Sequence, residues 1–186
     1  MAFARSFRAC VLLALVPTAL GGCATGPGPL QFPVSEGSAC KMQSAAGAYW
    51  SFGDFLENTS DGTVGIDSVT LVNPVNLDNE ANIILPLPPA GSGESAVGIG
   101  DWPLTGVSDG MRAARQDAAG AVVEPGEQVN LLTVVGRAAA GPDGHADAVE
   151  VRYHDSSGRR FAVTSKTALG VSAGGDCVVP PVESTG

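Results

Sequence analysis

Apolar and polar residues alternate in short runs along most of the chain, and Gly, Pro, Asn and Asp separate one run from the next. A period of two is typical of β-strands that bury one face, and the separating residues favour turns. We expect eight strands, at Ala48–Phe55, Val64–Val72, Asn82–Leu87, Ser95–Ile99, Gln128–Gly136, Ala148–His154, Arg160–Ser165 and Ala168–Ser172. Only Asp109–Ala119 has a helical pattern, with Asp109 as a cap and Gly120 as a stop.

The clearest alternation surrounds the sequence DSSG at residues 155–158. Val149, Val151 and Tyr153 alternate with polar residues before it, and Phe161 continues the alternation after it. This pattern predicts a β-hairpin with one buried face and one solvent-exposed face. Regularly spaced strands with at most one short helix predict an all-β fold, an antiparallel β-sandwich of about seven to eight strands.

The N-terminus has a different pattern, a cationic head followed by an apolar run. Arg5 and Arg8 precede Ala9–Leu20, which has 12 residues. A helix needs about 20 apolar residues to span a bilayer, so this run is too short for a transmembrane anchor. The segment is typical of a secretory signal peptide, which we assign to residues 1–22.

The end of this signal, LGGC at residues 20–23, resembles the lipobox of bacterial lipoproteins. The resemblance implies that a diacylglycerol is attached to the thiol of Cys23 and that the chain is cut just before this residue. Acyl chains such as palmitate would then hold the protein at the cell membrane, since two or three chains make attachment durable. The alternative is an ordinary cleavage near residues 19–22 that leaves Cys23 as a free thiol.

The remaining cysteines indicate a disulfide. Cys10 is removed with the signal, which leaves Cys40 and Cys177 as the two thiols of the folded part. Their pairing would close a loop of 138 residues, worth about 5 kcal/mol in the chain-entropy model. A reactive or metal-binding role is less favoured, because no third ligand or C-x-x-C spacing accompanies them.

Composition divides the rest of the chain into three parts. Residues 23–38 are rich in Gly and Pro and predict a flexible tether. Residues 39–179 form the sandwich, which is large enough for a single core. Residues 180–186 predict a disordered tail.

Several stretches carry a resemblance to a known group of proteins. They are FLENTSDGTVGIDSVTLV, VEPGEQVNLLTVVGR, ADAVEVRYHDSSGRRFAV and the late GGDC. They resemble the immunoglobulin-like domains of uncharacterised secreted proteins and lipoproteins from actinobacteria. This resemblance implies an immunoglobulin-like β-sandwich that serves in presentation, adhesion or partner binding, although a sandwich alone does not assign a function.

The net charge argues against nucleic acid as a partner. The chain has 10 Lys+Arg and 19 Asp+Glu, and removing residues 1–22 takes away two arginines, so the formal charge changes from −9 to −11. An acidic surface repels phosphates. Basic ligands and cations remain compatible with this charge.

Two tryptophans have different expected roles. Trp50 lies in an aromatic-rich strand and is expected in the core. Trp102, in GDWPL between strands, is the candidate partner-binding residue, because an aromatic ring on a loop suits contact with a sugar or a protein. Partial burial of Trp102 under its own loop is the alternative.

The catalytic and histidine motifs are weak. Residues 170–174 match G-x-S-x-G around Ser172, but no histidine follows in the chain, as that hydrolase motif requires. His145 and His154 are nine residues apart across a predicted strand, too far for one metal ion unless the chain bends sharply. We therefore predict no catalytic residues and no metal ligands among them.

Two oxygen-rich segments lack the geometry of a recognised calcium site. They contain Asn76, Asp78, Glu80 and Asn82 in one expected loop, and Asp143 and Asp147 in another. The first lacks the glycine turn and the distal bidentate acid of a calcium loop. No cofactor is implied.

The sequence thus predicts a non-catalytic module, anchored by lipid on the extracytoplasmic face of the cell membrane. We expect it to present a binding surface to an unknown envelope protein or wall component. The alternative is a solute- or metal-ion-binding lipoprotein that supports an envelope or transport system.

Overall fold

The computed structural model describes residues 28–33, 36–42, 47–93, 95–138 and 143–174, and these residues are mostly β-strand. The strands are β1 (Leu30–Gln31), β2 (Gly37–Met42), β3 (Tyr49–Asn58), β4 (Val64–Val72), β5 (Leu77–Pro86), β6 (Ile99–Trp102), β7 (Gln116–Asp117), β8 (Val122–Val123), β9 (Gln128–Arg137), β10 (Gly144–Ala146), β11 (Ala148–Asp155), β12 (Arg160–Thr164) and β13 (Thr167–Ser172). One short helix, α1 (Asp109–Ala113), lies between β6 and β7 in this part of the chain.

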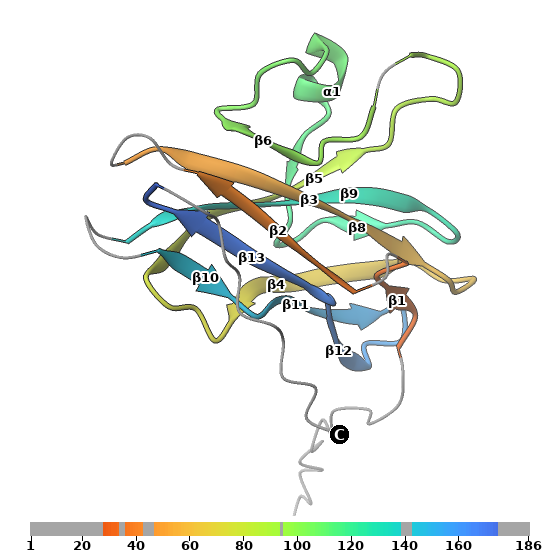
Figure 1. Cartoon of the computed structure of the whole chain (residues 1–186). Helices are drawn as coiled ribbons and strands as arrows, with labels where there is room; N and C mark the ends of the chain where they lie inside the picture. The colour runs from red at the N-terminus through yellow and green to blue at the C-terminus, as the bar shows by residue number, and fades with distance from the viewer. Residues whose placement is uncertain (1–27, 34–35, 43–46, 94, 139–142, 175–186) are drawn as a thin grey trace, which may run out of the picture.

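The first layer is a six-stranded antiparallel sheet. Its order is β1-β3-β9-β5-β7. β1 and β6 pair with the same edge of β3, β6 near the start of β3 and β1 at its end. The long central strands β3, β9 and β5 form the body of this sheet (Figure 1). Short edge strands on both sides limit the unpaired backbone that the sheet exposes.

The second layer is built on one long hairpin. β10 and β11 follow each other with only Asp147 between them, and they pair with β13 and β12 respectively. The Ser165 amide donates to the Val149 carbonyl and the Val149 amide donates to the Ser165 hydroxyl, which joins the two halves of the hairpin. β4 and β8 extend this layer on one side, and β2 extends it on the other by pairing parallel to β13.

The main core fills the space between the two layers. Every second residue of the facing strands points into it, as alternation requires. Its buried members include Phe52, Leu56, Ile66, Ile84, Leu131, Val151, Tyr153, Leu169 and Val171. Burying each large apolar side chain contributes about 1.5–3 kcal/mol, so this cluster is the main source of stability.

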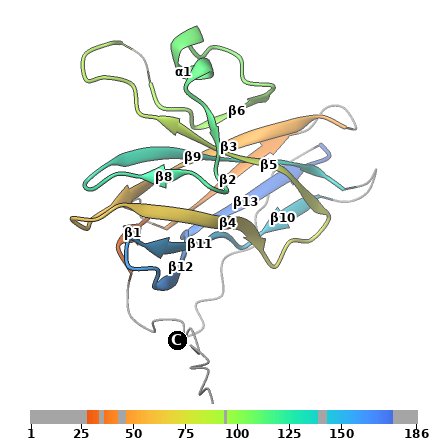
Figure 2. The ribbon, with the colours of Figure 1, turned by 180° about the vertical axis from the view of Figure 1, so that it is seen from behind.

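A second, smaller core lies on the opposite face of the first sheet. The segment that we call the cap, residues 87–93 and 95–115, leaves β5, contributes β6 and α1, and returns through β7 to the other edge of β5. Figure 2 shows the cap on the side of the first sheet away from β4 and β11. The buried residues of this cluster are Ile83, Leu85, Leu104, Met111 and Leu132. β9 is consequently buried on both faces.

The predicted all-β sandwich is confirmed, and several element bounds are corrected. β4 has the predicted bounds, whereas β5 begins five residues before the predicted Asn82. The strand expected at Ser95–Ile99 lies instead at Ile99–Trp102, because these residues pair with β3. The sandwich also has one parallel pair, β2 with β13, which an antiparallel prediction did not include.

The helix prediction was right in type and wrong in extent. Ser108, not Asp109, is the cap, because its hydroxyl accepts a hydrogen bond from the Met111 amide. The helix ends at Ala113, and Gln116–Asp117 forms β7 because it pairs with β5. Tertiary pairing outweighs local helical propensity in this short segment.

One whole strand and the start of another also lie within the predicted tether of residues 23–38. β1 pairs with the end of β3, and Leu30 is almost completely buried, while β2 begins at Gly37. The folded part therefore begins before residue 39. The described residues contain no helix that is long and apolar enough to cross a membrane. The predicted signal, residues 1–22, and the predicted tail, residues 180–186, lie outside them.

Candidate binding groove at Trp102

Trp102 lies at the end of β6, where the first sheet meets the cap. Its Cα is paired with that of Tyr49 on β3. The side chain is half-buried, because it packs against the small cluster that holds the cap. Trp102 is thus partly covered by its own segment, which was the alternative expectation, and it also lines a groove, while its role in partner binding stays a prediction.

The groove has a volume of about 310 Å³. Ala81 and Ile83, from the outer face of β5, line it together with Trp102 from the cap. Arg115, Gln116 and Asp117 complete the lining. Gln116 and Asp117 form β7, which pairs with β5. In this pairing Asp117 lies opposite Ile83, and Gln116 lies opposite Ile84.

Arg115 is an exposed cation that forms no ion pair with any described residue. Other basic side chains of this acidic chain do form ion pairs: Arg152 with Glu150, Arg159 with Asp155, and Lys166 with Glu36. Asp117 lines the same groove as Arg115 but is not paired with it. The groove therefore offers a guanidinium, a carboxylate and an aromatic ring.

Hydrogen bonds at Val97 and Gly98 tie the cap to the first sheet. The Asn130 side chain, 1% exposed, accepts a hydrogen bond from the Val97 amide (3.1 Å) and donates one to the Asp54 carbonyl (3.3 Å). The Gly53 amide donates to the Gly98 carbonyl at 2.7 Å. A Cβ on Gly53 would lie 1.8 Å from the Val97 carbonyl oxygen, so only glycine permits this approach.

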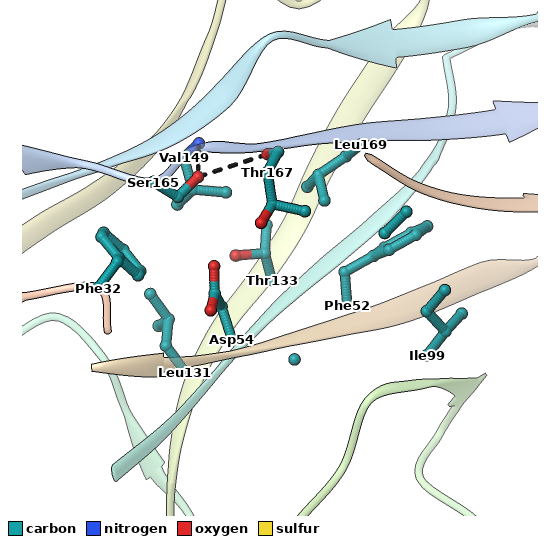
Figure 3. A pocket seen from close by; sticks show the side chains of 12 residues that line it. Phe32, Phe52, Asp54, Ile99, Leu131, Thr133, Val149, Ser165, Thr167 and Leu169 are labelled. Atoms are coloured by element: carbon teal, nitrogen blue, oxygen red, sulfur yellow. Dashed lines mark hydrogen bonds between the residues drawn. The ribbon is translucent and has the colours of Figure 1, made fainter. Parts of the chain in front are cut away.

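A second cavity, of about 30 Å³, lies between the two layers at Asp54. Figure 3 shows the Asp54 carboxylate pointing toward Thr133 and Thr167, with Phe32, Phe52 and other apolar side chains around it. Burial raises the pKa of Asp54, and hydrogen bonds from the Phe55 amide and the Thr167 hydroxyl oppose this rise. The cavity has room for about one water molecule, so it is too small for an organic ligand.

The histidines are not brought together. His154 lies on β11 with Nδ1 at 2.8 Å from an Asp67 carboxylate oxygen, on the outer face of the second layer. His145 lies on β10, where its backbone pairs with Val75. In the part of the chain that the structure describes, no group of three or more His, Cys, Asp or Glu residues is placed to hold a metal ion.

The other candidate motifs have structural roles. Ser172 is buried and its hydroxyl donates to Asp143, which also accepts from the Ala173 amide, and these two hydrogen bonds lower the pKa of Asp143. The oxygen-rich stretch at residues 76–82 was expected to be a loop, but from Leu77 onward it is part of β5. Trp50 packs against the main core, as predicted, with the Lys41 ammonium 4.5 Å from its ring centroid.

The cysteine predictions lie largely outside the described residues. Cys23 and Cys177 are both outside them, so lipidation and the disulfide stay predictions. Cys40 is half-buried on β2, paired in register with Gly170 of β13.

Sequence reasoning missed Arg115 and Asp117, because it placed both in a helix. The available signal was the break at Gly120 shortly after them, which is equally compatible with a turn or an edge strand. Asp54 was also missed, although its position between Phe52 and Leu56 marks it as facing the core.

Comparison with known proteins shows only distant likenesses. No protein-family model matches the chain, and no curated protein does. The chain is similar to the ASH/PapD-like domain 7 of human CEP192, with 11% identity and a TM-score of 0.41, over 87% of this chain and 98% of that one.

Two further solved structures are similar at the same level. The VesB protease of Vibrio cholerae has 11% identity and a TM-score of 0.37, over 74% of this chain and 30% of its own. A mutant of the CFA/I adhesin CfaE of enterotoxigenic E. coli has 10% identity and a TM-score of 0.39, over 79% of this chain and 49% of its own. At these scores the likeness is one of β-sandwich fold, and it supports no argument about function.

Proposed function

We propose that the chain is a non-catalytic module, anchored by lipid on the extracytoplasmic face of the cell membrane, that binds an envelope component through the groove at Trp102. The observation that carries this proposal is the lining of the groove. An aromatic side chain, held by packing, lines the same groove as a guanidinium that forms no ion pair with any residue described by the structure, on a strongly acidic chain. Tryptophan and arginine dominate binding energy at many protein surfaces.

The size and rigidity of the groove also support binding. Ligand pockets commonly have volumes of about 300–1,000 Å³, and this groove has about 310 Å³. Ala81 and Ile83 come from a long strand of the first sheet, and the cap is tied to that sheet by the hydrogen bond that the Val97 amide donates to Asn130. A ligand would therefore meet a largely pre-formed surface, which lowers the entropic cost of binding.

Membrane attachment is tested at Cys23. We expect radiolabelled palmitate to enter the wild-type chain and not the Cys23→Ser variant, and the variant to be released from the membrane fraction. Labelling of both proteins, or an unchanged membrane fraction for the variant, would contradict the anchor.

Binding is tested with the released Cys23→Ser chain, because its sedimentation with isolated envelopes then reports the groove rather than the lipid. We expect Trp102→Ala to reduce the bound fraction several-fold. Trp102→Phe, which keeps an aromatic ring and most of the packing, should bind at an intermediate level. Val122→Ala is the control, since Val122 is an exposed apolar residue on β8. Equal binding by all variants would remove Trp102 from the site.

The Cys40–Cys177 disulfide is part of the proposal, because an extracytoplasmic compartment allows disulfides to persist. Peptide mapping of the mature protein without reduction should recover the two cysteines in one linked peptide. Free thiols at both positions would contradict the pairing.

A second candidate function is solute binding that supports an envelope system. A wider pocket of about 450 Å³ in the cap favours it, and its lining includes the hydroxyl-bearing residues Ser95, Thr105 and Ser108. Native mass spectrometry of the mature protein would reveal a bound solute or metal ion. A stoichiometric ligand that survives Trp102→Ala would favour this second function over the first.

A further inference from the structure

We propose that the groove at Trp102 recognises an acidic sugar, a pyranose ring that carries a carboxylate. This inference rests on the proposed function and specifies the ligand of the same site. It uses the three chemically distinct side chains that line the groove, Trp102, Arg115 and Asp117.

Trp102 supplies the flat apolar surface. Part of the side chain is fixed by the cap cluster, and the rest lines the groove. An indole presents a large, rigid apolar face whose orientation is held at low entropic cost. The C–H face of a pyranose is the part of a polar, soluble molecule that fits against such a ring.

Arg115 supplies the recognition of the acid. A guanidinium binds a carboxylate through two parallel N–H···O bonds, which gives geometric specificity as well as energy. Arg115 has no carboxylate partner among the described residues, although the chain has 19 Asp+Glu. Among the described residues nothing competes for this guanidinium, so a close contact with one ligand carboxylate can form although the chain as a whole is acidic.

Asp117 distinguishes an acidic sugar from a simple anion. Its carboxylate lines the groove without pairing with Arg115, and would repel a small anion placed centrally between them. An ionised carboxylate accepts hydrogen bonds only, so it suits the hydroxyl groups of a sugar. A ligand with an acid at one end and hydroxyls along its ring satisfies both side chains.

The surroundings of the groove favour this ligand over a protein partner. The large apolar side chains that are most exposed among the described residues are Met42, Val75, Ile99 and Val122. None of them lines the groove. A protein interface is usually built around a buried apolar or aromatic core with a polar rim, and Trp102 is the sole aromatic residue of this lining.

The test measures binding of two matched probes by isothermal titration calorimetry to the Cys23→Ser chain. One probe is an oligogalacturonate, and the other is the same oligomer with its carboxyl groups reduced to primary alcohols. We expect the acidic probe to bind at least tenfold more tightly. Arg115→Gln should abolish this preference, Arg115→Lys should keep part of it, and Trp102→Phe should weaken both probes by a similar factor.

Arg160→Gln is the matched control, because Arg160 is also exposed and lies on β12 in the other layer. It should leave both affinities unchanged. Equal affinity for the two probes, no binding of either probe, or a preference that survives Arg115→Gln would overturn the inference. If neither probe binds while Trp102→Ala still reduces binding to envelopes, the acidic sugar is wrong and the proposed function stands. If Trp102→Ala leaves envelope binding unchanged, the proposed function itself fails.

Discussion

The two-faced burial of β9 leads to a prediction about two adjacent leucines. Leu131 points into the main core and Leu132 points into the cap cluster, and they are 1% and 0% exposed. Replacing each by alanine makes the same chemical change on opposite faces of one strand. Deletion of a buried Leu side chain costs about 2–5 kcal/mol, depending on how far the cavity closes.

The two variants should differ in where the structure opens. The cap cluster has five buried residues, so Leu132→Ala removes a large share of what holds the cap. We expect faster hydrogen exchange in residues 95–107, including the Val97 amide, and weaker binding at the groove. Leu131→Ala should instead lower the free energy of global unfolding, with no selective increase in cap exchange.

Hydrogen exchange followed by mass spectrometry gives this comparison directly. Since small domains are stable by about 5–15 kcal/mol, both variants should remain folded at 25 °C. An identical exchange pattern in the two variants would contradict this prediction, because it would mean that the cap and the sandwich open as a single cooperative unit.

Three further predictions concern two carboxylates that respond to pH and one buried hydroxyl. Burial raises the pKa of Asp54, so the contribution of this carboxyl to stability falls as the pH rises through that pKa. Asp54→Asn should therefore be more stable than the wild type at pH 7, and this difference in stability should vanish in acid, where Asp54 is protonated. Hydrogen bonds from Ser157 and Arg159 lower the pKa of Asp155, so Asp155→Asn should lose stability at pH 7, and the loss should shrink progressively as the pH falls below the ordinary pKa of aspartate. Thermal melts across pH test both, and the same sign for both variants would contradict them. Tyr153→Phe removes the acceptor of the buried Leu30 amide and should cost about 1–3 kcal/mol in urea unfolding; an unchanged midpoint would count against this.

The second layer shows what the sequence could predict. The alternation of apolar and polar residues around the turn at residues 155–158 predicted the bounds of β11 and β12 to within one residue at each end. This was possible because one face of the hairpin is buried and the other is exposed to solvent. β2 was not predicted, since GSACKM has no clear alternation and forms a strand through its parallel pairing with β13. A strand that depends on a distant partner leaves little local signal.

The groove shows what the sequence could not predict. Trp102 could be chosen as a candidate because an aromatic residue between strands is unusual enough to notice. Its neighbours in the groove include Ala81 and Arg115, which are far from it or from each other in the sequence. These segments meet only because β6 pairs with β3 and β7 pairs with β5. Such contacts depend on topology, and two-residue edge strands such as β7 are set by that topology rather than by local propensity.

Photocrosslinking in the native envelope can show whether the groove at Trp102 contacts an envelope component. A photoreactive p-benzoylphenylalanine would replace Gln116 in the groove of the full-length chain, or Thr70, an exposed residue on β4 in the other layer. We expect a discrete crosslinked species from position 116 that Trp102→Ala removes, and none from position 70. Equal crosslinking from both positions, or crosslinking at 116 that persists in Trp102→Ala, would contradict it.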